Sequence, residues 1–357
     1  MSPDTLARPP ALIVRPLATS EEGAWEDFVQ HAAAATFFHR VGWRRIIEST
    51  LDHRTHYRGA WRGGDLAGIL PLVEVKSRRF GHALLSTGFT VGGGIAALDG
   101  ETAQRLADEA ARLGRTLGVD FIELRQETLP AGCALPGWRA KDGLYCGFAR
   151  ALAPTAEANL KAIPRKKRAD LRKAIDNPAL RVETAASIDT FFRLYGESLR
   201  NLGTPILPKR FYAAVVREFS DDVEISAIVG PRGPVAALMT FFFKNRAMPY
   251  YGGAGAAARP LHAYDLLYWR LMERAVARGA TLFDFGRSKR GTGAFDYKTY
   301  WGFSPLPLAY RYDLPGGGEL PEINPLNPKY RAMIAMWRVL PLPVANTLGP
   351  LVARQIG

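Results

Sequence analysis

Cysteine, histidine and long apolar runs are all scarce in this 357-residue sequence. The two cysteines, Cys133 and Cys146, provide no disulfide framework and lack the spacing of a metal site, and the six histidines are scattered. No apolar run reaches the ~20 residues of a membrane span. Residues 1–13 also lack the charged-then-apolar order of a secretory signal. We therefore expect a cytoplasmic protein that needs no metal.

Several enzyme signatures are missing as well. The sequence has no G-x-S-x-G elbow, no phosphate-binding Walker loop, no H-E-x-x-H pair and no G-x-G-x-x-G after a first strand. These absences argue against hydrolases with a serine elbow, P-loop nucleotidases, zinc proteases and dinucleotide-binding enzymes.

Positive charge, in contrast, is abundant, with a net charge of +13. Such an excess favours a polyanionic partner: nucleic acid, an anionic membrane surface, or phosphorylated or acidic glycans. The strongest cluster is Arg165, Lys166, Lys167 and Arg168, which follows Pro164 at the start of a predicted helix. The cluster is either a clamp for phosphates or a solvated helix face near a domain boundary.

One order of predicted elements occurs twice. The first half has strands at 57–61 and 66–75, a glycine-rich segment at 84–95, a helix at 102–117 and a strand at 119–124. The second half has strands at 223–229, 235–243 and 248–251, a helix at 262–278 and a strand at 281–285. A helical region at 24–50 precedes the first set. We interpret the chain as a duplicated α/β unit, in which each half is a hairpin followed by strand, helix and strand.

A cationic loop follows the last strand of the second copy only. Asp284 lies on that strand, and Arg287, Lys289, Arg290 and Lys298 surround the glycines that come next. A carboxylate beside cations and glycine-rich backbone suits transfer of an activated acyl group to an amine or hydroxyl. The alternatives are a basic surface loop and a structural ion pair between Asp284 and Arg287.

The last segment, 319–357, is rich in proline and markedly apolar. Residues 330–340 can form a short helix, whereas Pro341 and Pro343 are expected to interrupt the chain after it. We expect this tail to pack on the body of the protein. The alternative is an interfacial contact that reaches a lipid-linked substrate.

Six motifs give the chain a family resemblance over nearly its whole length. They are Ile163-Pro164-Arg165-Lys166, Leu202-Gly203-Thr204-Pro205, Tyr250-Tyr251-Gly252-Gly253, the segment 283–293, Trp301-Gly302-Phe303 and Pro321-Glu322-Ile323-Asn324-Pro325. With these the chain resembles the FemAB-related proteins of the PEP-CTERM/exosortase system, which are Fem-type transferases. The resemblance implies tandem GNAT-like acyltransferase domains, each a mixed, mostly antiparallel sheet flanked by helices. It also implies acyl or aminoacyl transfer to a cell-envelope glycoconjugate, an exopolysaccharide or peptidoglycan precursor.

The resemblance also suggests residue roles. Fem-type enzymes carry a lysine before an aromatic–glycine–aromatic segment, and here Lys298 precedes Trp301-Gly302-Phe303. Lys298 would stabilise the developing oxyanion, and Asp284 would orient the acceptor or act as base. The remaining candidates would bind the substrates: Arg287, Ser288, Lys289 and Arg290 through anionic groups, Tyr250 and Tyr251 as pocket walls, and Gly252 and Gly253 through their amides.

The donor stays open between acyl-coenzyme A and aminoacyl-tRNA, because no clear pyrophosphate loop precedes the helix at 262–278. Expected partners are a glycan or glycolipid acceptor, with tRNA and the inner-membrane surface as further candidates, and no DNA. We expect domains at 1–155 and 156–318, the second carrying the active site, followed by the tail at 319–357. An acetyl-coenzyme A-dependent N- or O-acetyltransferase and a non-catalytic polyanion-binding scaffold are the alternative functions.

Overall fold

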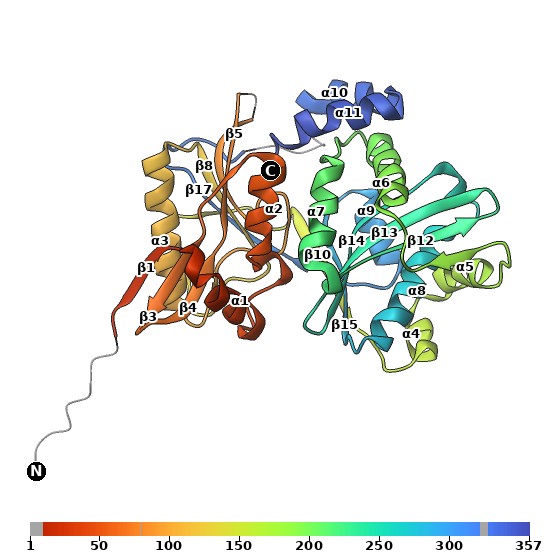
Figure 1. Cartoon of the computed structure of the whole chain (residues 1–357), viewed down its shortest axis with the longest axis horizontal. Coiled ribbons are helices and arrows are strands. Elements are labelled where there is room, and N and C mark those ends of the chain that lie inside the picture. Colours follow the sequence, from red (N-terminus) through yellow and green to blue (C-terminus); the bar gives the residue numbers. More distant parts are fainter. Residues whose placement is uncertain (1–9, 79, 322–327) are drawn as a thin grey trace, which may run out of the picture.

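The computed structural model describes residues 10–78, 80–321 and 328–357, in which two α/β halves lie side by side (Figure 1). The first half contains β1 (Leu12–Pro16), α1 (Glu22–His31), α2 (Gly42–Leu51), β2 (Arg54–Thr55), β3 (Arg58–Arg62), β4 (Asp65–Leu70), β5 (Leu72–Ser77), β6 (Gly81–Ser86), β7 (Ala96–Ala97), α3 (Gly100–Leu117), β8 (Phe121–Gln126), β9 (Arg139–Ala140) and β10 (Tyr145–Ala151). The second half contains α4 (Ala156–Ala162), α5 (Arg165–Ile175), β11 (Arg181–Glu183), α6 (Ile188–Leu202), α7 (Lys209–Phe219), β12 (Val223–Gly230), β13 (Gly233–Phe243), β14 (Arg246–Ala254), α8 (Ala263–Ala277), β15 (Leu282–Lys289), α9 (Gly293–Tyr300), β16 (Leu306–Pro307) and β17 (Ala309–Asp313). Helices α10 (Pro328–Val339) and α11 (Leu342–Ala353) follow.

The order of elements repeats as predicted, except that the strand predicted at 66–75 is two strands, β4 and β5, which belong to different sheets. In each half a hairpin leads to a strand, a long helix and a further strand that returns parallel to an earlier one, β6 with β8 and β14 with β15. The long helices end where the glycines predict, since Gly118 after α3 has φ +65° and Gly279 after α8 has φ +80°. The duplicated α/β architecture is therefore confirmed.

The two halves exchange strands. The sheet of the second half has the order β11-β12-β13-β14-β15-β10-β16, so β10 of the first half lies inside it. In return, β17 of the second half pairs with β8 in the sheet β2-β5-β6-β8-β17-β9. The remaining first-half sheet is β1-β3-β4-β7. A boundary at residue 155 stays a prediction, because it divides the chain between strands that cross from one half to the other.

A shared aromatic core fixes the halves against each other. The helical region predicted at 24–50 is two helices, and the loop between them buries Phe37 and Phe38. Phe37 stacks on Phe241 of β13 with ring centroids 4.6 Å apart, and Trp43 lies 5.2 Å from Phe219 of α7. These contacts hold the elements that line the cavities of the protein in a rigidly packed arrangement.

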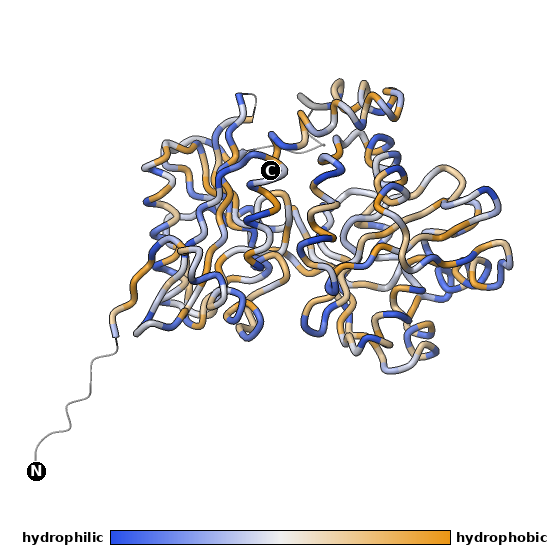
Figure 2. The backbone as a smooth tube through the Cα atoms, viewed as in Figure 1, coloured by the Kyte–Doolittle hydropathy of each residue, from blue (hydrophilic) through white to orange (hydrophobic). Residues whose placement is uncertain are grey.

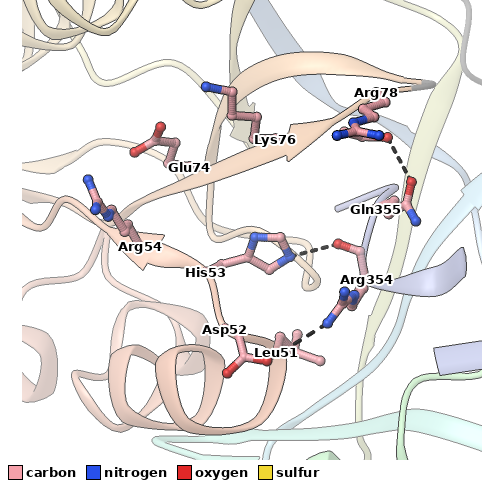
Figure 3. Close-up of a pocket in the computed structure, with 10 residues that line it drawn as sticks. Leu51, Asp52, His53, Arg54, Glu74, Lys76, Arg78, Arg354 and Gln355 are labelled. Atoms are coloured by element: carbon pink, nitrogen blue, oxygen red, sulfur yellow. Dashed lines mark hydrogen bonds and ion pairs between the residues drawn. The ribbon is translucent and has the colours of Figure 1, made fainter. Parts of the chain in front are cut away.

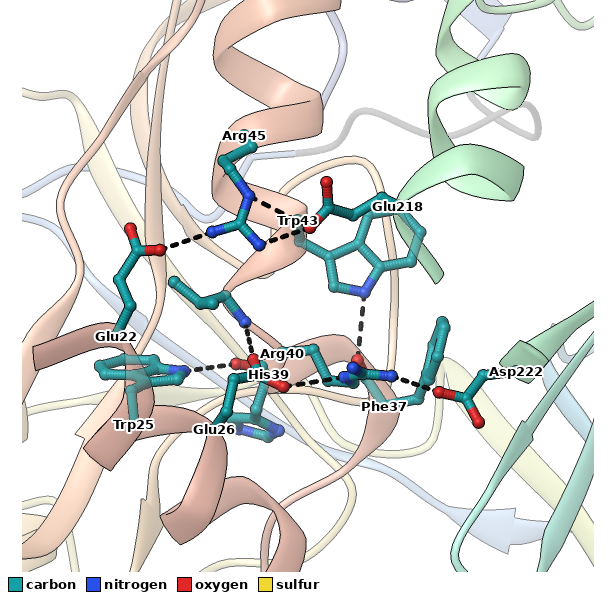
Figure 4. A network of polar contacts seen from close by, with 11 residues as sticks. Glu22, Trp25, Glu26, Phe37, His39, Arg40, Trp43, Arg45, Glu218 and Asp222 are labelled. Carbon is teal, nitrogen blue, oxygen red and sulfur yellow. Dashed lines mark hydrogen bonds and ion pairs between the residues drawn. The ribbon is translucent and has the colours of Figure 1, made fainter. Parts of the chain in front are cut away.

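Ion pairs surround this core (Figure 4). Arg40 joins Glu26 of α1 to Asp222 of the second half, with nitrogen–oxygen distances of 2.9 and 2.5 Å. Arg45 similarly joins Glu22 to Glu218 of α7. Each arginine therefore contacts carboxylates from both halves.

The tail forms two helices where the sequence predicts one. Pro341 and Pro343 do not interrupt the chain, because they occupy the N-cap and first turn of α11, where a missing N–H costs nothing. Both helices pack against α6, and the chain then returns to the first half. There the Arg354 carbonyl accepts a 2.7 Å hydrogen bond from His53, and the Arg354 guanidinium lies 3.8 Å from Asp52 (Figure 3). The tail motif at 322–325 lies outside the described residues.

Candidate active site

The main cavity opens where two parallel strands diverge. β14 and β15 pair only at Arg246 with Leu282 and at Ala247 with Phe283. Beyond these pairs a cavity of about 690 Å³ lies between residues 249–252 of β14 and 285–289 of β15, and we call it the wedge cavity. Tyr264 and Tyr268 of α8 and Lys298 of α9 also line it, as do Glu123 and Arg125 of the first half.

A bulge in β15 shapes the wall of this cavity. Opposite the three-residue step from Asp284 to Arg287, the antiparallel partner β10 advances only from Ala149 to Gly147. Gly286 takes up the extra residue with φ +68°, a conformation that strains any residue with a Cβ. In a regular strand the side chains of Asp284 and Arg287 would point to opposite faces of the sheet. Because the bulge adds one residue between them, they lie on the same face.

Lys298 and Asp284 meet at this bulge. The Lys298 ammonium donates hydrogen bonds of 3.1 Å to the Gly286 carbonyl and 3.0 Å to the Arg287 carbonyl. On the other side of the same residue, the Asp284 carboxylate accepts a 2.8 Å bond from the Gly286 N–H. The two predicted catalytic residues therefore bracket one glycine. Burial lowers the pKa of Lys298 to about 7, although the nearby Asp284 raises it.

A second cavity, of about 480 Å³, lies on the Asp284 side. Its walls are mainly apolar, from Phe38, Phe148, Met248, Leu282, Leu306 and Leu308. The two cavities share one wall, made of Val91, Tyr250, Gly286 and Arg287. We call the second one the acceptor-side cavity.

Asp284 is not paired with Arg287, contrary to the structural alternative. Its partner is Arg246, whose guanidinium lies 3.3 Å from Asp284 and 3.3 Å from Glu127 of the first half. Burial raises the pKa of Glu127, while Arg246 opposes the shift. The carboxylate–guanidinium–carboxylate group closes one end of the acceptor-side cavity.

Arg287 sits between tyrosines. It donates a 3.0 Å hydrogen bond to the Tyr310 hydroxyl, and its guanidinium lies 4.4 Å from the centre of the Tyr145 ring. Tyr250 also lies on the shared wall, where its hydroxyl accepts a 2.8 Å bond from the Val91 N–H. Tyr250 thus lines the cavity as predicted, whereas the predicted role of Arg287 in binding an anionic group stays a prediction.

Two buried hydroxyls in the wedge cavity are unsatisfied. Ser288 is 5% exposed and Tyr251 7%, and within the described part of the chain neither side-chain oxygen has a hydrogen-bond partner. A buried polar group without a partner costs free energy unless a ligand or water satisfies it. Their position therefore favours a polar ligand in this cavity.

The glycine pair of β14 serves packing first. A Cβ on Gly253 would lie 2.5 Å from the Tyr195 backbone, and one on Gly252 would lie 2.2 Å from the Tyr264 hydroxyl. Only glycine allows α6 and Tyr264 to approach β14 this closely. Of the pair, Gly252 lines the wedge cavity.

Carboxylates occupy the surroundings of the turn before α8. The Glu197 side chain accepts a 3.3 Å bond from the Ala256 N–H, and Asp265 lies in the first turn of α8. Asp265 pairs with Lys167 at 2.5 Å and accepts a bond from the Tyr297 hydroxyl. Negative charge at a helix N-terminus competes with a phosphate for the same amides.

The basic cluster is divided by its helix. Arg165 and Lys166 are exposed on α5, whereas Lys167 turns inward to Asp265 and lies 4.6 Å from the Tyr297 ring. Arg168 is half-buried and donates a 2.9 Å bond to the Lys161 carbonyl. The four side chains do not form one continuous surface.

The remaining candidates differ in position. Lys289 lines the wedge cavity, whereas Arg290 is exposed and lies 5.6 Å from the Phe295 ring. The sequence does not identify Arg246 and Glu127 as neighbours of Asp284, because this group forms through contacts between residues far apart in the chain. Glu123, which also lines the wedge cavity, could have been identified from the sequence, because it lies five residues after Gly118 as Asp284 does after Gly279.

In the described part of the first half, the position that corresponds to the open gap beside Lys298 is filled by the Gln126 side chain. Beyond the paired residues of β6 and β8, the Gln126 amide accepts a 2.5 Å bond from the Ile95 N–H and donates to the Ile95 carbonyl. A Cβ on Gly94 would lie 1.4 Å from the Gln126 oxygen, so this side chain fills the space next to Gly94.

A mixed sheet with diverging parallel strands, present twice, is the tandem GNAT fold, and comparison with known proteins agrees. Residues 161–299 match the sequence profile of the acetyltransferase (GNAT) domain family. This match and the fold support an acyltransferase of the GNAT type.

Solved structures with the same fold have low sequence identity. FemX has a TM-score of 0.66 at 13% identity, covering 90% of this chain and 100% of that one. A tandem GNAT protein from the clavulanic acid biosynthesis pathway has a TM-score of 0.54 at 14% identity, covering 87% and 100%. The C-terminal domain of a putative lysylphosphatidylglycerol synthetase from Agrobacterium fabrum has a TM-score of 0.55 at 14% identity, covering 82% and 91%. No curated protein sequence matches the chain.

Proposed function

We propose that the protein transfers an acyl or aminoacyl group to an amine or hydroxyl of a cell-envelope glycoconjugate. One observation carries the proposal: Lys298 and Asp284 bracket Gly286 from two sides, and each faces a different cavity across a shared wall. A donor in the wedge cavity and an acceptor in the acceptor-side cavity would meet at this bulge. Positioning of this kind converts a bimolecular reaction into an effectively unimolecular one.

The chemistry follows from the two side chains. The acceptor nitrogen or oxygen attacks the donor carbonyl carbon, and Asp284 takes the proton that the nucleophile loses. The Lys298 ammonium stabilises the oxyanion of the tetrahedral intermediate. When the intermediate collapses, the bond to the donor's leaving group breaks, and that group leaves with a proton from solvent or from Asp284.

The donor is better matched by aminoacyl-tRNA than by coenzyme A. Glu197 already accepts the Ala256 N–H in the turn before α8, where a diphosphate would need backbone amides. The exposed Arg165 and Lys166 of α5 could contact a nucleic acid backbone instead.

The envelope assignment rests on similarity. FemX and the lysylphosphatidylglycerol synthetase domain share the fold, and the latter is named for a product that joins lysine to a lipid. The motif resemblance to FemAB-related proteins favours the PEP-CTERM/exosortase context and an exopolysaccharide or peptidoglycan precursor as acceptor.

Thermal stability with separate ligands tests the proposal. A ligand at ~100 times its dissociation constant adds about 2.7 kcal/mol to the free energy of unfolding. We expect a rise in melting temperature with aminoacyl-tRNA that is larger than with uncharged tRNA. A rise with acetyl-coenzyme A alone would instead identify an acetyltransferase, and no response to any donor would contradict transferase activity.

A further inference from the structure

Helix α11 packs on the body with its small residues. Its buried positions are Ala345, Gly349 and Ala353, spaced four residues apart on one face. A Cβ on Gly349 would lie 3.0 Å from backbone atoms of Ile206, so the helix lies close to the chain beneath it. The face of α11 that packs on the body is therefore narrow and consists of small residues.

Five large apolar residues of the tail helices are exposed, although Trp337 of α10 is buried. Val344, Leu348 and Leu351 of α11 are 41%, 42% and 55% exposed, and Met336 and Val339 of α10 are 56% and 78% exposed. A surface helix of a soluble protein ordinarily buries its large apolar residues and exposes polar ones. Here the arrangement is reversed, and Figures 1 and 2 show the two helices side by side at the edge of the molecule, with apolar residues along them. Clustered exposure of this kind marks an interaction surface.

The charged residues of the tail segment 328–357 are all cationic. Residues 328–357 contain Lys329, Arg331, Arg338 and Arg354 and neither aspartate nor glutamate. Arg331, Arg338 and Arg354 are exposed. Beside α11, Lys76, Arg78 and Arg354 line a groove of about 620 Å³, together with Asp52 and Glu74 (Figure 3). The tail helices therefore contribute only cations beside their apolar residues, while the adjoining groove carries both signs of charge.

We propose that α10 and α11 form a docking surface for an anionic lipid bilayer. Apolar side chains enter the boundary between headgroups and acyl chains, and the surrounding cations contact anionic headgroups. No helix in the described residues is long and apolar enough to cross a bilayer, so the contact is interfacial. A second copy of the chain fits this surface less well, because a self-interface would bring the cations of two tails together.

This surface continues to the wedge cavity. Leu351 and Val352 line a groove with Arg78, Phe80 and Gln355, and both Phe80 and Gln355 also line the wedge cavity. Docking would therefore hold the mouth of that cavity at the bilayer. Under the proposed function, on which this last step rests, the substrate reaching that cavity would be lipid-borne.

Vesicle flotation tests the docking surface with the full chain. We expect binding to vesicles of phosphatidylcholine with phosphatidylglycerol, weakening as salt rises, and weak binding to phosphatidylcholine alone. The double variant V339E/L348E should bind at least tenfold more weakly. Its matched control, I13E/L98E, replaces two apolar residues of the first half that are also exposed, and should bind as the unmodified chain does.

A second pair of variants tests the charge. R331Q/R338Q should lower binding several-fold, whereas R165Q/K166Q, which removes the same charge from α5, should not. Equal losses in both would show attraction by net charge alone and overturn the assignment. So would unchanged binding of V339E/L348E, or absence of binding by the unmodified chain.

Two further measurements separate the alternatives. A chain that is dimeric by size-exclusion chromatography and monomeric as V339E/L348E would show a self-interface and overturn the proposal. Failure of the transferase function would appear differently, as vesicle binding that is intact without turnover of any donor.

Discussion

Replacing Lys298 by methionine should separate stability from activity. Methionine preserves most of the side-chain length and the packing near Phe148, whose ring centre lies 5.4 Å from the Lys298 nitrogen. It removes the charge and the two hydrogen bonds to the Gly286 and Arg287 carbonyls.

The magnitude follows from the lowered pKa. A shift from 10.5 to about 7 corresponds to roughly 5 kcal/mol against the buried ammonium, at about 1.4 kcal/mol per unit. The lost hydrogen bonds, at about 1–2 kcal/mol each, offset part of that gain. The free energy of unfolding of Lys298→Met should therefore be roughly 1–3 kcal/mol higher than that of the unmodified chain near pH 7.

The same change should lower turnover by a factor of about 10²–10³, as removal of an oxyanion donor does. Chemical denaturation measures the stability, and transfer of a radiolabelled aminoacyl group measures turnover. The control is Lys161→Met, which changes an exposed lysine of α4 and should alter neither quantity. A variant that is markedly less stable, or that keeps full turnover, would show that Lys298 supports the bulge and takes no part in the chemistry.

Four further predictions concern the same bulge. Asp284→Asn should keep an acceptor for the Gly286 N–H but lower kcat by roughly 10²-fold, with little change in the melting temperature; unchanged kcat would exclude a proton-accepting role. A Cβ added at Gly286 or Gly279 would have no atom within 4 Å, but these glycines have φ +68° and +80°. Gly286→Ala and Gly279→Ala should therefore each lower the free energy of unfolding by roughly 1 kcal/mol, while only Gly286→Ala should lower turnover. The ammonium of Lys298 is the active form and its pKa is about 7, so kcat should fall as pH rises through 7. This fall in kcat should disappear in Lys298→Arg. If it stays unchanged in the variant, the titrating group is another residue. The linked stability has the opposite sign: the lowered pKa penalises the charged form, so the free energy of unfolding should rise between pH 7 and 10.5 in the unmodified chain but not in Lys298→Met.

Local patterns in the sequence predict much of the fold. The spacing of apolar residues and the glycines at 118 and 279 define two helix ends within a residue or two, because helix caps depend on neighbouring residues. The tail shows the limit of such rules. Pro341 and Pro343 can end a helix or begin one, and the outcome depends on the contacts of Ala345 and Gly349 with the body.

The same limit applies to the candidate site: local patterns predict some of its residues, and contacts between distant residues determine the others. Asp284 and Lys298 are predicted from the sequence because a carboxylate at a strand end and a lysine in a motif are visible there, and their catalytic roles stay predictions. The partner of Asp284 is not predicted, since Arg246 and Glu127 reach it only through the packing of β14 and the first half. Lys167 looked like part of a basic surface, but its partner Asp265 lies almost a hundred residues further along the chain.

The exchange of β10 and β17 makes the two halves dependent on each other for assembly. A fragment ending at residue 155 would leave β10 without the strands it pairs with, and the remaining fragment would lose the strand between β15 and β16. Assembly of the second-half sheet therefore depends on β10 of the first half, which lies between β15 and the edge strand β16 and pairs with the bulged part of β15. A duplicated chain joined in this way keeps both copies even when, as we propose, only one of them carries the chemistry, because each half completes the sheet of the other.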